Sequence, residues 1–417
     1  MLDLRRIRSE PDAVRAALGR RGDLNIGEAL NRVLTLDARR RELLPELEQL
    51  RERKNKASED IAAAKRSGED ASAAIAAMRD VGAREKALSA ELAEIDGGLA
   101  EAQTALPNIP ADEAPQGDRV LREAGEAGKA GRDHLELAGP MIDMEAGARV
   151  AGSRFAYLRG DLVMVEFALV RWALERLRAH GHEPVVPPVL AREEALYGTG
   201  FLPDTEQQIY RLADDPLYLV GTSEVPLASL HAGEILDEEA LPRRYAAFSS
   251  CFRREAGAAG KDTRGIFRVH QFDKVEMFSF VAPERSAEEH ERLLGIEEQL
   301  LGELEIPYRV VDISVDDLGA SAARKFDLEA WLPGQERYRE LTSCSNTTDF
   351  QARRLEIRMR PAGGGRPVVA HTLNGTAVAV GRTIIALLEN GQREDGGVDL
   401  PGVLAVFGAP RSLSPPP

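Results

Sequence analysis

Apolar residues recur at alternating steps of three and four positions along the first part of the chain. One such seam covers residues 26–61, a second covers residues 71–106, and a polar turn at residues 65–70 separates them. This spacing predicts two helices that pack against each other as an antiparallel coiled-coil hairpin. At 1.5 Å per residue, about 35 residues reach roughly 50 Å, so we expect a projecting arm over about residues 27–106.

Polar residues interrupt both seams, at Arg40 and Lys54 in the first and at Glu85 in the second. Pro45 also falls inside the first helical pattern. Because proline lacks an N–H group and clashes with the preceding turn, we expect it to kink or split that helix. The periodicity suits a dimerisation or scaffolding hairpin as well as it suits a binding arm.

The arm pattern ends at Leu106, because Pro107 and Pro110 stop a helix and open an extended linker. We therefore expect an N-terminal domain, residues 1–106, and a second domain, residues 107–417. Residues 145–180 have helical periodicity, and beyond residue 185 short apolar strands alternate with turns without a regular βαβ repeat. This predicts an α+β fold in which a mainly antiparallel sheet is flanked by helices.

The composition is typical of a folded globular protein, since 29% of the 417 residues are charged and 43% are hydrophobic. No apolar run approaches the roughly 18 residues of a membrane span, and the charged start of the chain predicts no export signal. Cys251 and Cys344 are too few and too far apart for a metal-binding pair or a disulfide framework. We expect a cytoplasmic protein without membrane contact.

The net charge of −15 argues against a nucleic-acid partner, because binding phosphates requires a basic surface. However, residues 1–106 carry 19 Lys and Arg against 20 Asp and Glu, so the negative charge lies almost wholly downstream. A basic stripe on the N-terminal domain is therefore compatible with the sequence. The seven histidines form no metal-binding pattern, and we expect each to be structural or exposed.

Two strand-like runs, residues 245–255 and 266–281, flank a charged, glycine-containing loop at residues 256–265. They predict a long hairpin, and strand alternation places on one face a set of side chains, most of which are charged or aromatic. That set is Cys251, Arg253, Glu255, Arg268, Phe272, Lys274 and Glu276. A purine could stack on Phe272 while Arg253 contacts a phosphate. The alternative is a salt-bridged face with Phe272 as part of the core.

The segment CFRREAGAAGKDTRGIFRVHQFDKVEMF resembles motif 2 of class II aminoacyl-tRNA synthetases, in the form found in the seryl-tRNA synthetase family. GTSEVPLASLHAGEIL is similar to the serine-binding segment of that family, and YRELTSCSNTTDFQARR to its metal and nucleotide segment. HTLNGTAVAVGRTIIALLEN resembles motif 3, and residues 180–188 resemble motif 1, the dimer-interface element. With the arm included, the resemblance covers nearly the whole chain.

The resemblance implies catalytic roles for Arg253, Glu276 and Arg382. Arg253 is expected on the α-phosphate of ATP, Arg382 on its γ-phosphate, and Phe272 against the adenine ring. The implied ATP-binding residues are Arg253, Arg254, Glu255, Val269, Phe272, Glu340, Leu341, Thr342, Ser343 and Arg382. The implied serine-binding residues are Thr222, Ser223, Glu224, Glu276 and Thr376, of which Glu276 and Thr376 are expected on the serine hydroxyl.

By the same resemblance, Glu340 and Ser343 hold Mg²⁺, and no zinc is expected. Residues three apart on a regular strand face opposite sides, so both side chains can reach one metal only across a bulge or at the strand end. The alternative for this segment is an ordinary edge strand.

The resemblance further implies activation of L-serine with ATP to seryl-adenylate, and transfer of the seryl group to the 3′ end of tRNA(Ser) and of tRNA(Sec). The arm would lie along the tRNA, and the chain would form a homodimer. The loop at residues 256–265 would become ordered when adenylate or the acceptor end of the tRNA binds. One alternative is a paralogue that charges a non-tRNA carrier, although such relatives often lack the arm. Another is a non-catalytic scaffold, which would be expected to lose Arg253, Glu276, Glu340 or Arg382.

Overall fold

The computed structural model describes every residue except 24, 204–205, 257–261, 263 and 417. The chain divides into two compact units: Leu2–Pro107, and Asn108–Pro417 together with Met1. Among the described residues, no helix combines the length and the apolar character that crossing a membrane would require.

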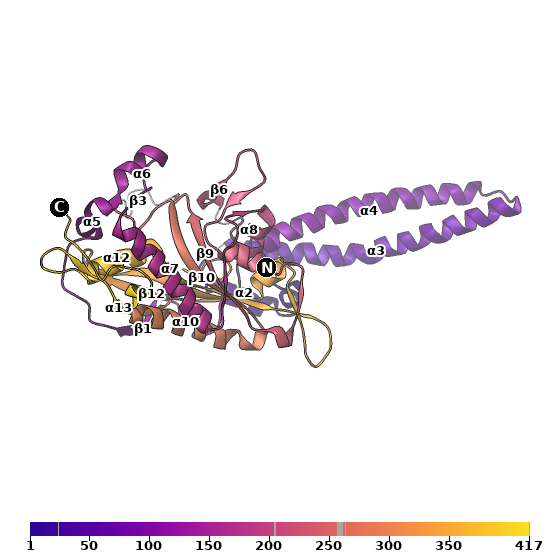
Figure 1. The fold of residues 1–417 in the computed structure, drawn as a ribbon. Coiled ribbons are helices and arrows are strands. Elements are labelled where there is room, and N and C mark those ends of the chain that lie inside the picture. The colour runs from indigo at the N-terminus through magenta and orange to yellow at the C-terminus, as the bar shows by residue number, and fades with distance from the viewer. Residues whose placement is uncertain (24, 204–205, 257–261, 263, 417) are drawn as a thin grey trace. The chain divides into compact units, whose positions relative to one another are not determined.

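The first unit is helical throughout its regular structure. It contains α1 (Leu4–Ser9), α2 (Pro11–Gly19), α3 (Asn25–Ser67) and α4 (Ser72–Thr104). The long helices α3 and α4 run side by side in opposite directions (Figure 1), with Leu43, Leu47, Leu88 and Ile95 buried between them. The predicted helical arm is confirmed, whereas α1 and α2 were not predicted, because they are too short to show a period.

Polar residues of the two seams pair across the arm. The Arg40 Nε atom lies 2.7 Å from Asp96 Oδ1, and the Lys54 Nζ atom lies 2.5 Å from Glu85 Oε2. The helix α3 continues through Pro45, so the predicted split does not occur. Pro45 is exposed and its neighbours Leu43 and Leu47 are buried, so the missing hydrogen bond falls on the solvent side of the helix, where water can satisfy the carbonyl group.

The second unit is built on an eight-stranded sheet of order β1-β11-β12-β13-β16-β10-β9-β4. Every neighbouring pair is antiparallel except β4 and β9, which confirms the predicted mainly antiparallel sheet. In that order the strands are Arg119–Ala124, Tyr308–Asp312, Arg324–Leu332, Arg337–Thr348, His371–Ala379, Gln271–Val281, Arg243–Phe252 and Glu183–Val185.

Three helices cover one face of this sheet: α7 (Asp161–Ala179), α10 (Ser286–Glu303) and α12 (Val380–Asn390) (Figure 1). Val275 and Met277 of β10 are fully buried in the core that these helices share with the sheet. Because side chains alternate along a strand, Phe272, Lys274 and Glu276 of the same strand face the other side. This second face carries charge near the start of β10, whereas farther along it Phe278 and Phe280 are buried in a second apolar cluster with residues of α9 (Glu224–Ser229) and α11 (Phe350–Arg354).

Shorter elements complete the second unit. The helices are α5 (His134–Ala138), α6 (Met144–Ala151), α8 (Glu193–Thr199), α9 (Glu224–Ser229), α11 (Phe350–Arg354) and α13 (Gly402–Ala405). Two three-stranded sheets are β15-β14-β8 (Val368–Val369, Arg358–Arg360, Ile235–Asp237) and β5-β7-β6 (Leu190–Ala191, Tyr218–Leu219, Tyr210–Arg211). Two strand pairs are β2-β3 (Ile142–Asp143, Tyr157–Leu158) and β17-β18 (Val398–Asp399, Ser412–Leu413).

Two predicted elements have different bounds in the structure. The helix expected over residues 145–180 is interrupted. The helix α6 ends at Ala151, because Gly152 after it has a φ of 99° and leaves the helical region, and α7 begins only at Asp161. The predicted hairpin strands are shorter than their patterns, since β9 ends at Phe252 and β10 begins at Gln271. Residues 253–255 and 266–270 are thus loop segments rather than strand.

Candidate active site

A cavity of about 370 Å³ opens on the charged face of the main sheet. Its lining comes from β10, β12, β13 and β16, from the first turns of α9 and α12, and from loops that include Thr222, Arg253 and residues 266–269. Its charged lining residues are Glu224, Arg253, Glu255, Arg268, Lys274, Glu276, Lys325, Glu340 and Arg382. Such a concentration of both signs in a concave site suits a ligand that is itself charged at several points.

Arg253 and Arg382 both line this cavity, although they lie far apart in the sequence. Arg253 Nε donates to the Gly221 carbonyl at 3.2 Å, and its guanidinium lies 5.3 Å from the ring centre of Phe272. Arg382 Nη1 donates to the Glu340 carbonyl at 3.1 Å. Burial, partly offset by Glu340 and reinforced by the charge of Arg253, lowers the pKa of Arg382. The two guanidiniums therefore act on one space, and an anion placed there would be stabilised by both.

Further along the cavity wall, Glu255 accepts a hydrogen bond of 2.5 Å from Arg268 Nη1. Val269 and Phe272 line the same region. An apolar wall beside an aromatic ring and a planar cation suits a flat, partly polar ring system.

The opposite end of the cavity is a small polar pocket built by Thr222, Lys274 and Glu276. Lys274 forms an ion pair with Glu276, and its Nζ donates to Thr222 Oγ1 at 2.8 Å. Thr222 Oγ1 in turn donates to Glu276 Oε2 at 3.1 Å. Thr376 lies directly across from Glu276 on the neighbouring strand β16 and also lines the cavity. This pocket offers carboxylate and hydroxyl groups to a ligand of small size.

Glu224 closes this pocket. Its Oε1 accepts hydrogen bonds from Gln351 Nε2 at 2.7 Å and from Asn374 Nδ2 at 2.9 Å. Burial, together with the nearby charge of Glu276, raises the pKa of Glu224 to about 7. A cationic group bound here would favour the ionised carboxylate and would be held by it.

A bulge on β13 brings Glu340 and Ser343 to the same face of the sheet. Thr342 pairs with Leu328 of β12 and Glu340 pairs with Glu329, so Leu341 is an extra residue between the two pairs. The bulge makes Glu340 and Ser343 two register positions apart, and both line the cavity with Leu341. Glu340 and Ser343 can therefore reach the same metal ion, although they are three residues apart in the sequence.

The electrostatics around Glu340 favour its ionised form. Desolvation opposes ionisation, but the charges of Arg382, Lys325 and Arg253 outweigh it and lower the pKa of Glu340. An anionic oxygen beside a hydroxyl oxygen is a donor set suited to a hard cation such as Mg²⁺.

Three of the residues that the sequence implicated have side chains outside the cavity lining. Arg254 is exposed, and its backbone N–H donates to the Gln208 carbonyl at 2.8 Å. Ser223 Oγ shares a hydrogen bond of 2.7 Å with Ser249 Oγ. Thr342 points to the helix-covered face, where its Oγ1 donates to Glu297 Oε2 at 3.1 Å.

The remaining implicated residues are brought together in the cavity. They are Thr222, Glu224, Arg253, Glu255, Val269, Phe272, Glu276, Glu340, Leu341, Ser343, Thr376 and Arg382. Of the loop expected to become ordered, residues 257–261 and 263 lie outside the described residues. Within it, Asp262 Oδ2 accepts from Arg339 Nη2 and Asp133 Oδ2 accepts from Arg264 Nε, both at 2.7 Å.

Sequence reasoning missed Lys325, Phe267 and Asn374 as cavity residues. The position of Lys325 could have been predicted from the sequence, because the polar residues Lys325 and Asp327 alternate with the apolar residues Phe326 and Leu328 along β12. The position of Phe267 could not have been predicted, because Phe267 lies in a loop where the sequence pattern predicted a strand.

Comparisons with known proteins agree with the architecture just described. The family model of the seryl-tRNA synthetase N-terminal domain matches residues 1–110, and that of the tRNA synthetase class II core domain (G, H, P, S and T) matches residues 209–391. The chain is similar to the serine–tRNA ligase of Acidothermus cellulolyticus, at 50% identity over 97% of each chain. It is also similar to that of Nocardia farcinica, at 48% identity over 100% of each chain.

Among solved structures, the seryl-tRNA synthetase of Pyrococcus horikoshii complexed with ATP is similar to this chain with a TM-score of 0.94. The identity is 40%, and the alignment covers 100% of both chains.

Proposed function

The chain belongs to the seryl-tRNA synthetase family, the serine–tRNA ligases, and from this premise we propose which of its residues carry each part of the reaction. Membership confirms the resemblance that the sequence motifs indicated. In the first step the carboxylate of serine attacks the α-phosphorus of ATP and pyrophosphate leaves. In the second step a ribose hydroxyl at the 3′ end of the tRNA attacks the seryl carbonyl and AMP leaves.

The observation that carries the residue assignment is the convergence of Arg253 and Arg382 on one cavity beside Glu276. Arg253 binds the α-phosphate, Arg382 binds the γ-phosphate, and the adenine stacks on Phe272 with Glu255 and Val269 at its edge. Negative charge builds up on phosphate oxygens during the attack, so two fixed guanidiniums stabilise the transition state, and no protein nucleophile is required. The similar enzyme of Pyrococcus horikoshii is complexed with ATP, which supports a nucleotide site in this chain as well.

Serine occupies the small polar pocket. Its hydroxyl bonds to Glu276 and Thr376, and its ammonium lies near Thr222 and Glu224. A pocket that pairs its own polar groups with a substrate hydroxyl rejects an analogue without one, because those groups are then left unpaired. The carboxylate of serine then points toward Arg253, where the α-phosphate lies.

Glu340 and Ser343 are the residues that would hold Mg²⁺. The bulge at Leu341 turns both toward the cavity, and the ionised state of Glu340 suits a divalent cation. When bound, the metal supplies neutralisation of phosphate charge. The absence of zinc, the charging of tRNA(Sec) and a cytoplasmic location stay predictions.

Pyrophosphate exchange into ATP, measured with serine, threonine, alanine and glycine in turn, tests the substrate assignment. Exchange with serine is expected to exceed that with alanine by a factor of about 10⁴, as for sites built around a substrate hydroxyl. Exchange that proceeds equally with alanine would contradict the role given to Glu276 and Thr376.

The helical arm binds the tRNA, as its match to the seryl-tRNA synthetase N-terminal domain supports. Arg53 and Lys56 are exposed on α3 and are suited to phosphate contacts. Replacing both with Glu should raise the KM for tRNA several-fold and reduce its salt dependence, about one unit of slope per lost contact, while pyrophosphate exchange stays unchanged. The matched control is Glu59→Lys, another exposed charge change on the same helix. Equal tRNA charging by the variant and the control would contradict the arm's role.

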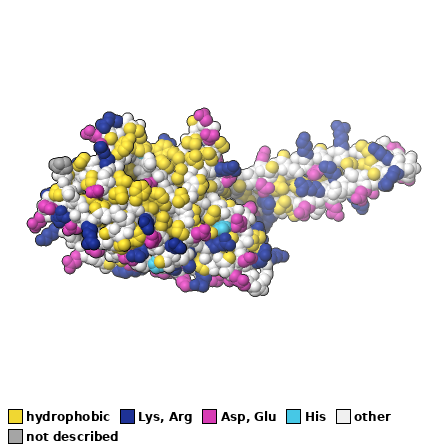
Figure 2. Space-filling view, viewed as in Figure 1, with side chains coloured by type: hydrophobic (Ala, Val, Ile, Leu, Met, Phe, Trp, Pro, Cys, Tyr) yellow, Lys and Arg dark blue, Asp and Glu magenta, His cyan; other side chains and the backbone are white. Residues whose placement is uncertain are grey.

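A homodimer forms through the apolar surface over α7. Phe167 is 62% exposed, and Val150 and Val186 are 73% and 82% exposed. Figure 2 shows a broad apolar area on the face of the molecule where α7 lies. A patch of this kind is typical of an interface between copies. Phe167→Glu should shift the sedimentation of the chain toward the monomer, whereas Ile75→Glu, an equally apolar exposed position in the arm, should not.

A further inference from the structure

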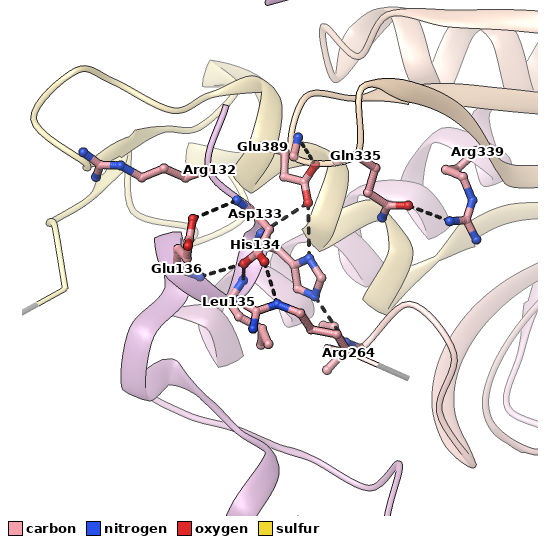
Figure 3. Close-up of polar contacts among 12 residues, drawn as sticks. Arg132, Asp133, His134, Leu135, Glu136, Arg264, Gln335, Arg339 and Glu389 are labelled. Carbon is pink, nitrogen blue, oxygen red and sulfur yellow. Dashed lines mark hydrogen bonds and ion pairs between the residues drawn. The ribbon is translucent and has the colours of Figure 1, made fainter. Parts of the chain in front are cut away.

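A buried carboxylate lies at the last turn of α12, the helix whose first turn carries Arg382. Glu389 is fully buried, and the partial negative charge of a helix C-terminus disfavours an anion there. Backbone and side-chain donors compensate. Glu389 Oε1 accepts from the His134 backbone N–H at 3.2 Å, and Oε2 accepts from the Gly334 N–H at 2.9 Å. The His134 ring contributes a third bond, from Nδ1 to Oε1 at 3.2 Å (Figure 3).

The His134 ring makes a second contact on its other side. The backbone N–H of Ile266 lies 3.3 Å from His134 Nε2. A backbone N–H can only donate, so Nε2 carries the lone pair and the ring proton is on Nδ1, which donates to Glu389. The side chain of His134 is 5% exposed, and its ring bridges two segments in one fixed orientation.

The backbone at Gly265 lies very close to the His134 ring. Gly265 has a φ of 74°, and a Cβ atom there would lie 1.9 Å from His134 Nε2. On the other side of the same turn, Arg264 pairs with Asp133, the residue before His134 (Figure 3). Two contacts therefore hold residues 264–266 against the start of α5.

The segment held in this way contacts Arg382. Phe267 follows Ile266, and its carbonyl accepts from Arg382 Nε at 3.4 Å. The Arg382 guanidinium also lies 4.7 Å from the centre of the Phe267 ring. One short segment, residues 266–267, thus touches the first turn of α12 through Arg382 and is tied to its last turn through His134 and Glu389.

We propose that His134 is a positioning residue for the activation step. Its unprotonated Nε2 fixes the backbone at Ile266, and thereby the Phe267 carbonyl that orients Arg382 toward the ATP phosphates. His134 does not line the cavity and acts only through this chain of contacts. The proposal rests on the proposed binding of the triphosphate by Arg382.

Two substitutions separate the two sides of the ring, since the amide of Asn reaches the place of Nδ1 and that of Gln the place of Nε2. His134→Gln keeps an acceptor for Ile266 and should leave the KM for ATP within about twofold of its original value. His134→Asn keeps a donor for Glu389 but leaves the buried Ile266 N–H unpaired, and should raise the KM for ATP about tenfold. The KM for serine should stay unchanged in both. His180→Asn, at a half-buried histidine whose ring bonds to Gln299, is the matched control.

Equal KM values for ATP in the Asn and Gln variants, or a parallel rise in the KM for serine, would overturn the proposal. Arg264→Gln removes the second contact at an exposed position, so folding is not at risk. It should raise the KM for ATP by about two- to threefold, and no change would count against the proposal. Arg382→Gln, measured alongside, separates the two hypotheses. If it leaves the KM for ATP unchanged, the proposed phosphate site is wrong, whereas if it raises that KM and His134→Asn does not, only the role of His134 is wrong.

Discussion

The arm and the cavity both pair side chains of opposite charge, across two helices in the arm and along one strand in the cavity, but the surroundings of the two pairs differ. The side chains of Arg40 and Asp96 in the arm are 34% and 48% exposed, whereas those of Lys274 and Glu276 in the cavity are 8% and 2% exposed. Water screens the first pair, so it contributes mainly to the register of the two helices. The second pair is shielded, so each charge depends strongly on its partner.

In the cavity, the buried surroundings shift the pKa values of carboxyl groups in both directions. The pKa of Glu224 is raised to about 7 by burial and by Glu276, while that of Glu340 is lowered because cations outweigh desolvation. Carboxyl groups whose pKa values are shifted in opposite directions within one cavity are typical of a reactive site. The arm uses its charges to hold a shape, and the cavity uses them to hold a ligand.

The largest expected effect comes from breaking the buried pair. Lys274→Met leaves the carboxylate of Glu276 buried without its cation and should lower the free energy of unfolding of the second unit by about 3–5 kcal/mol. Both tryptophans of the chain, Trp172 and Trp331, lie in that unit, so tryptophan fluorescence during urea unfolding reports on it. The double variant Lys274→Met with Glu276→Leu removes both charges and should recover much of the loss. A single variant as stable as the original chain would mean that the pair is solvated as in the arm.

Removal of a phosphate-binding cation is expected to act on the reaction and not on stability. Arg382→Gln should reduce serine-dependent pyrophosphate exchange by about a hundred- to a thousandfold, as expected when a fixed donor to a developing anion is lost. The matched control is Arg393→Gln, because Arg393 pairs with Asp395 and Asp399 at the surface. A reduction of less than about threefold would argue against a transition-state role.

The pH dependence of the serine pocket should follow Glu224. Its pKa in the folded chain is about 7, above the ordinary value of 4.5, so the folded state retains a proton that the unfolded state releases between these values. Stability should therefore fall as pH rises through this window. The affinity for serine should change in the opposite sense, because the substrate ammonium needs the ionised carboxylate.

The KM for serine, measured by pyrophosphate exchange, is thus expected to fall by up to about tenfold per pH unit below pH 7 and to level off above it. Glu224→Gln should flatten this profile while raising the KM at high pH. A profile unchanged by the substitution would assign the titration to another group.

Much of the fold followed from local pattern, and so did part of the site. The heptad seams predicted α3 and α4 because the spacing of apolar residues in each seam depends only on residues of the same helix. Strand alternation placed Arg253, Phe272 and Glu276 on one face for the same reason, and the structure brings all three to the cavity. Their assignment to particular ligand atoms came from the family resemblance.

The features that the sequence pattern could not predict depend on contacts between segments that are far apart in the sequence. The bulge at Leu341 is visible only in the pairing of β13 with β12, although it decides that Glu340 and Ser343 share a face. Each histidine was expected to be structural or exposed, and the contacts of His134 could not be foreseen because Glu389 and Ile266 are both far from it in sequence. Of the kink or split predicted at Pro45, the split does not occur, because the effect of a proline on a helix depends on which side of the helix faces water.

The smallest expected effect is the coupling energy between Arg40 and Asp96 in the arm, which can be compared directly with that between Lys274 and Glu276 in the cavity. A double-mutant cycle with Arg40→Ala and Asp96→Ala should give a coupling energy of about 0.2–1 kcal/mol, because both side chains remain accessible to solvent. Unfolding can be followed by far-UV circular dichroism, to which the long helices α3 and α4 contribute strongly. Added salt should reduce this coupling further, whereas the coupling of Lys274 with Glu276 should be little affected because salt does not screen a buried pair. A coupling energy above about 2 kcal/mol in the arm that does not change with salt would mean that Arg40 and Asp96 also behave as a buried pair. The arm and the cavity would then differ in how their charges are arranged and not in how well water solvates them.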